Sequence, residues 1–69
     1  MKVEDVVKGK RVITISDFSG IIPVGAKGTL IETNDSAPYV DFDEHYEGCF
    51  EVNIYKNVRS MMVDELRKI

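Results

Sequence analysis

The clearest alternation of hydrophobic and polar positions lies between residues 39 and 43. Val40 and Phe42 fall on one side of this segment, whereas Tyr39, Asp41 and Asp43 fall on the other. A period of two is typical of a strand with one buried face. The pattern therefore predicts a strand over residues 39–43 with both carboxylates on its solvent side.

A second alternation covers residues 50–55, where Phe50, Val52 and Ile54 fall on one side. The polar segment 44–48 separates it from the first alternation, and two polar residues follow it. We predict one strand over residues 50–55, joined to the preceding strand by a polar loop.

A first strand is predicted over residues 10–15, which are rich in β-branched side chains and follow a glycine. Its inward face stays open between two pairs. Val12 and Thr14 form one pair, and Ile13 and Ile15 form the other.

Another strand is predicted over residues 27–33, directly after a turn signal. The signal is the run Pro23-Val24-Gly25-Ala26-Lys27-Gly28-Thr29. Proline presets the entry of a turn and glycine supplies the positive φ of its exit. The connection before this strand, residues 16–26, is long for a hairpin and contains apolar residues, so we expect it to fold over one end of the sheet. Those apolar residues are Phe18, Ile21 and Ile22.

Both ends of the chain are open to two interpretations. Residues 1–8 form an N-terminal arm or a short helical turn, since their valines have helical spacing. Residues 58–69 form either a short helix capped by Ser60, or a strand, one 3₁₀ turn over residues 63–66 and a closing strand. We favour the second because an isolated two-turn helix is marginal and a closing strand would cover a sheet edge.

Four segments together resemble the SH3-like small-barrel superfamily: residues 9–12, 23–30, 39–43 and 63–69. They follow the layout G-x-x-V, P-x-G-x-x-G-T and V-x-F-D, which is most similar to KOW-type domains, the small E-type barrels of photosystem I and small bacterial or phage domains. The resemblance implies an all-β fold: a five-stranded SH3-like small barrel with a long first loop and a 3₁₀ turn before the last strand. Peptide-binding SH3 domains carry an aromatic-rich groove, whereas this chain has no tryptophan.

Length and composition set further bounds. Sixty-nine residues suffice for one domain with a modest core, so we expect a single domain over residues 1–69. The chain has no apolar run long enough to span a membrane and no apolar segment typical of a signal peptide. Its single cysteine, Cys49, excludes an intrachain disulfide and favours a reducing, cytoplasmic location.

The net charge of −3 conceals a strong asymmetry. Residues 28–55 contain seven acids and neither lysine nor arginine. Because carboxylates bind arginine and tyrosine rings stack on cations, we predict an acidic surface that engages a basic protein partner. The protein would then be a non-enzymatic binding module or small regulatory subunit. The candidate partner-binding residues are Asp41, Asp43, Glu44, Glu47, Tyr39 and Tyr46.

The same acids do not predict a metal site or a catalytic site. Asp41 and Asp43 lie roughly 7 Å apart along one strand, and the spacing of an EF-hand loop is missing. General acid-base catalysis by two carboxylates needs one of them desolvated, which the solvent side of a strand does not provide. We predict no catalytic residue, metal or cofactor.

The alternative function is nucleic-acid binding by a KOW-like domain. The first and last strands are neighbours in this fold type, which would gather four basic residues into a patch for phosphates. The four are Lys10, Arg11, Lys27 and Arg67. The negative net charge disfavours this alternative, because it repels a polyanion.

Overall fold

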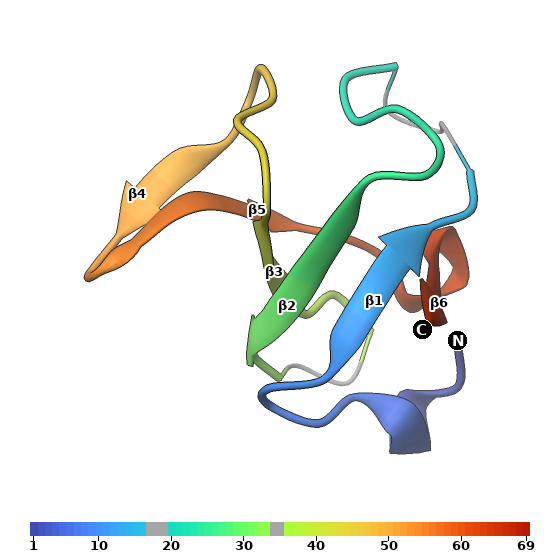
Figure 1. Ribbon diagram of the computed structural model, residues 1–69. Helices are drawn as coiled ribbons and strands as arrows, with labels where there is room; N and C mark the ends of the chain where they lie inside the picture. Colours follow the sequence, from blue (N-terminus) through green and yellow to red (C-terminus); the bar gives the residue numbers. More distant parts are fainter. Residues whose placement is uncertain (17–19, 34–35) are drawn as a thin grey trace.

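Six antiparallel strands form one sheet in the computed structural model, which describes residues 1–16, 20–33 and 36–69 (Figure 1). The sheet order is β4-β5-β3-β2-β1-β6. The all-β prediction is confirmed. The strands are β1 (Arg11–Thr14), β2 (Lys27–Glu32), β3 (Tyr39–Phe42), β4 (Phe50–Val52), β5 (Tyr55–Ser60) and β6 (Leu66–Lys68), and two 3₁₀ turns are η1 (Val3–Asp5) and η2 (Val63–Glu65).

The number of strands and the closure of the sheet differ from the prediction. Within the described residues, β4 and β6 each pair with one strand, so the hydrogen-bonded ladder is open. The predicted strand over residues 50–55 is wrong, because Asn53 and Ile54 form a two-residue turn between β4 and β5. Asn53 has a φ of 56°, a left-handed conformation that asparagine tolerates better than most residues. The five predicted strands are therefore six.

The hydrophobic core takes alternate residues from the central strands. Val40 and Phe42 of β3 are buried and Asp43 is exposed, which confirms the predicted orientation of this strand. Ile22, from the long β1–β2 connection, is also fully buried in the core, whereas Phe18 of the same connection lies outside the described residues. The buried core consists of Val12, Ile22, Ala26, Leu30, Val40, Phe42, Met61 and Leu66.

Thr14 decides which face of β1 points inward. Thr14 is buried with Val12, whereas Ile15 is exposed. Its hydroxyl donates to the Pro23 carbonyl at 2.7 Å and accepts from the Ala26 N–H at 3.0 Å. A buried hydroxyl with both a donor and an acceptor partner loses little on leaving water. The inward threonine therefore fastens the β1–β2 connection to the sheet.

The two glycines of the predicted bend act in different ways. Gly25 has a φ of 91°, as expected for the exit of a turn. Gly28 has no positive φ, but a Cβ atom there would lie 2.6 Å from Val40 Cγ1 and 2.8 Å from the Asp41 carbonyl oxygen. Gly28 is therefore required because β2 and β3 approach each other closely at this position.

The C-terminal segment follows the favoured interpretation, with η2 leading into β6 and β6 pairing with β1. A helix capped by Ser60 is wrong, since Ser60 ends β5. The buried Glu65 carboxylate accepts from the Met62 N–H at 2.9 Å and so caps η2. At the other end of the chain the short turn η1 forms, and the Met1 ammonium donates to the Leu66 carbonyl at 2.8 Å.

Candidate functional site

The acidic residues gather in the loop that connects β3 to β4, residues 43–49, which projects beside the long β1–β2 connection in Figure 1. Asp43, Glu44 and Glu47 are exposed there, together with His45. We call residues 43–48 the acidic loop. Glu44 and Glu47 have no ion pair within the described part of the chain. Both carboxylates are therefore available to a cationic group from outside.

Asp43 is already paired with a base of this chain. Both of its carboxylate oxygens accept from the Arg11 guanidinium, at 2.7 and 2.6 Å. These hydrogen bonds lower the pKa of Asp43 against the opposing effect of burial, and the Arg11 and Lys27 charges lower it further. The same contact raises the pKa of Arg11. Asp43 is thus a structural member of the acidic loop, and its charge is neutralised.

Asp41 also has a partner within the fold. It is half-buried on β3, and its carboxylate accepts from the Asn57 N–H of β5 at 3.2 Å. The Asn57 side chain lies within 3.0 Å of His45 Nδ1 and donates to the Phe42 carbonyl at 3.5 Å. Asn57 therefore fixes the start of the acidic loop to β5. The sequence analysis missed this residue because it placed Asn57 beyond the end of a strand.

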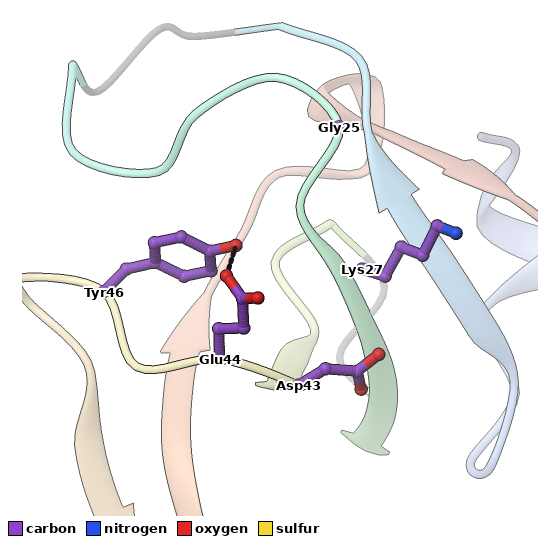
Figure 2. A pocket seen from close by; sticks show the side chains of 5 residues that line it. All are labelled: Gly25, Lys27, Asp43, Glu44 and Tyr46. Carbon is purple, nitrogen blue, oxygen red and sulfur yellow. Dashed lines mark hydrogen bonds between the residues drawn. The ribbon is translucent and has the colours of Figure 1, made fainter.

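Tyr46 forms the inner wall of the acidic loop. Its ring packs edge-on against Phe42, with 5.8 Å between ring centroids. Figure 2 shows its hydroxyl donating to Glu44 Oε2, at 3.2 Å. Burial raises the pKa of Tyr46, and the neighbouring Glu44 charge raises it further. The hydroxyl therefore stays protonated and holds the Glu44 carboxylate in place.

A shallow pocket of about 190 Å³ lies beside this pair, lined by Gly25, Lys27, Asp43, Glu44 and Tyr46. Small-molecule sites usually enclose roughly 300–1,000 Å³. The Lys27 side chain points away from the pair in Figure 2, toward β1. The pocket is thus a hollow in a binding surface, and its size does not suit an enclosed substrate or cofactor.

Tyr39 is separated from the other candidate residues. It begins β3, whereas the acidic loop follows the end of that strand. Its ring packs edge-on against Phe50 with 6.3 Å between centroids. The structure therefore brings Asp43, Glu44, Glu47 and Tyr46 together and places Tyr39 with the β4–β5 hairpin.

Arg59 is a second residue that the sequence analysis missed. It lies half-buried on β5, and its guanidinium donates to the Gly48 carbonyl at 3.5 Å. A Cβ atom on Gly48 would lie 2.6 Å from Arg59 Nη1. The end of the acidic loop thus rests on an arginine, and a glycine is needed for that contact. The wrong strand boundary at residue 55 hid Arg59 as well as Asn57.

Three of the four basic candidates share the outer face of the sheet. Arg67 lies opposite Ile13, which lies opposite Lys27, and side chains of directly opposed residues emerge on one face. Arg11 is on the same face, but Asp43 and Thr29 occupy its guanidinium. Lys10 immediately precedes Arg11 in the extended chain, so its side chain emerges on the other face. The predicted basic patch is therefore reduced to two unpaired bases.

Within the described residues, no group of three or more His, Cys, Asp or Glu side chains is arranged to hold a metal ion. Cys49 is a free, half-buried thiol that packs against the core.

Comparison of the chain with models of protein families, with curated proteins and with solved structures finds no match. In the part of the chain that the structure describes, no helix has the length and apolar character needed to cross a bilayer. The site must therefore be interpreted from its own chemistry.

Proposed function

We propose that this protein is a non-enzymatic binding module that engages a basic surface of a protein partner through its acidic loop. The observation that carries the proposal is the state of Glu44 and Glu47. Both are exposed, and neither has an ion pair among the described residues, whereas Asp43 beside them is neutralised by Arg11. Carboxylates that lack a cation of their own chain are suited to arginine or lysine from another chain.

The support beneath the loop strengthens this proposal. Tyr46 holds Glu44, Asn57 contacts His45, and Arg59 holds the Gly48 carbonyl. A binding loop fixed to a rigid sheet loses less conformational entropy when a partner binds. The Tyr46 ring beside the carboxylates can also stack on a cation.

We further propose that the fold is an SH3-like small barrel to which one strand has been added. Three features support this assignment: a long connection after β1, the turn η2 directly before β6, and the pairing of β6 with β1. β1, β2, β3, β5 and β6 would correspond to the five strands of that fold, and β4 would be the addition. The free thiol of Cys49 supports a reducing, cytoplasmic setting.

The function is tested by reversing the charges of the loop. The double variant Glu44→Lys/Glu47→Lys should bind an arginine-rich peptide about tenfold more weakly than the original chain, because each exposed ion pair contributes up to about 1 kcal/mol. Capture of partners from a lysate of the native host, with identification by mass spectrometry, should show the same loss.

The matched control is Glu4→Lys/Asp64→Lys, which makes the same charge change at exposed positions in η1 and η2. This control should keep nearly all of the binding. Equal losses in both double variants would show that net charge alone attracts the peptide, and the proposal would be abandoned.

Nucleic-acid binding is the second candidate, and the row formed by Arg67, Ile13 and Lys27 is the observation in its favour. Only two unpaired bases stand in that row, so we rank it below partner binding. It requires salt-sensitive binding of RNA or DNA that Arg67→Glu abolishes. Absence of a mobility shift at high protein concentration and low salt would remove it.

A further inference from the structure

The outer edge of β4 is open. Within the described chain β4 pairs with β5 alone. Phe50 at its start is 47% exposed, and Ile54 in the adjoining turn is 85% exposed. An edge strand leaves backbone N–H and C=O groups unpaired and so can accept a further strand. The β4–β5 hairpin, which projects from the rest of the sheet in Figure 1, thus combines unpaired backbone with exposed apolar side chains.

The opposite edge of the sheet is protected. β6 carries the exposed bases Arg67 and Lys68, and charged residues on an edge strand discourage further pairing. Lys68 forms an ion pair with Asp5 of η1 at 3.2 Å, and the Met1 ammonium occupies the Leu66 carbonyl. Figure 1 shows the N-terminal segment beside β6. The two edges therefore differ, and β4 is the one open to a partner.

The charges around β4 select the kind of strand that it can accept. Glu51 lies exposed in the middle of β4, and Glu47 lies exposed in the loop before it. Pairing of two β4 edges from two copies of this chain would bring their acids together, which like-charge repulsion opposes. A strand that places lysine or arginine opposite Glu51 is attracted instead. Since β4 alternates apolar, acidic and apolar residues, its complement alternates apolar and basic residues.

We propose that the β4 edge binds an extended segment of the partner in which basic and apolar residues alternate, and that this segment adds a strand to the sheet. The inference rests on the proposed function and specifies the conformation of the partner. Backbone hydrogen bonds along β4 supply affinity, and alternate side chains supply specificity. The acidic loop lies at the start of the same strand, so one extended segment can contact both.

The test compares two peptides of equal charge. The first is a hexapeptide of alternating valine and lysine, and the second is the same peptide with proline in place of its central valine. Proline removes a backbone donor and disfavours pairing. We expect the first peptide to bind about tenfold more tightly, the equivalent of one to two hydrogen bonds. Equal binding would overturn the edge proposal and leave the acidic loop standing, whereas no binding of either peptide at low salt would overturn both.

A variant locates the contact on β4. Residues that flank a two-residue hairpin turn exchange their hydrogen bonds, so Val52 faces Tyr55 and the N–H of Glu51 points to the open edge. Glu51→Pro should lower the affinity for the valine-lysine peptide about tenfold and leave the proline peptide unaffected. Glu51→Gln, which removes only the charge, should have a smaller effect. If Glu51→Pro does not fold, amide exchange at Glu51 in the original chain decides: slowing upon peptide binding supports the proposal, and unchanged exchange overturns it.

Discussion

Arg11 and Asp43 lie 32 positions apart in the chain and form a two-pronged ion pair on the outer face of the sheet. Arg11 belongs to β1 and Asp43 follows β3, so the pair passes over β2, where Thr29 accepts a further hydrogen bond from Arg11 at 2.9 Å. One residue of the predicted basic patch thus neutralises one residue of the predicted acidic surface. The unpaired acidic charge moves to Glu44 and Glu47 as a result.

The energy of this pair can be measured with a double-mutant cycle over Arg11→Ala and Asp43→Ala. Urea unfolding should give a coupling energy near the upper end of the range for exposed pairs, about 0.5–1 kcal/mol, because both oxygens are engaged. The coupling should shrink at high salt. A coupling of zero, or one that salt does not change, would contradict the assigned geometry.

Acid should weaken the fold through the same residue. The folded state holds the pKa of Asp43 below its ordinary value of 3.8, so the unfolded chain binds the proton more tightly. This contribution is present above the unfolded pKa and is lost as pH falls through the folded pKa. We expect the free energy of unfolding to fall below about pH 4, and to fall less steeply in Asp43→Asn. Glu47→Gln, which removes an unpaired carboxyl, should keep the original slope; equal slopes in all three proteins would contradict this prediction.

Replacing Thr14 by valine should destabilise the protein by about 1–2 kcal/mol, because the Pro23 carbonyl loses its buried hydroxyl donor. Thermal and urea unfolding measure the loss. Hydrogen exchange should also become faster at Gly25 and Ala26, whose N–H groups contact Thr14. The control is Thr29→Val, which makes the same change at a less buried position of β2 and should cost less. A larger effect at Thr29 would show that Thr14 does not fasten the connection.

Gly28→Ala tests the close approach of β2 and β3. The added methyl group would meet Val40 Cγ1 and the Asp41 carbonyl oxygen, and such overpacking costs about 1–3 kcal/mol. In a Val40→Ala background the cost of Gly28→Ala should fall but not vanish, since the backbone oxygen remains. A cost that is negligible in both backgrounds would show that the strands are farther apart than described.

The success of the sequence analysis followed from local pattern. The alternation over residues 39–43 places Val40 and Phe42 in the core because a single strand with one wet face needs nothing else to fix its orientation. The order of η2 and β6 was likewise predicted from a segment too short for a stable helix. These features depend on neighbours in sequence.

The failures came where alternation continued through a turn or where partners are distant in sequence. Ile54 keeps the spacing of Phe50 and Val52 but sits in a hairpin turn, and the only local signal was the preceding asparagine. The inward face of β1 depends on a threonine that bonds a loop nine or more residues away. The Arg11–Asp43 pair requires the register of three strands, which composition does not encode.

The most direct test of the account is an NMR titration of the protein with an arginine-rich peptide, followed through backbone amide shifts. The account predicts that the largest shifts fall on Glu44, Tyr46 and Glu47, and that Glu44→Lys/Glu47→Lys abolishes them. Shifts centred instead on Ile13, Lys27 and Arg67, or spread evenly over the surface, would contradict it.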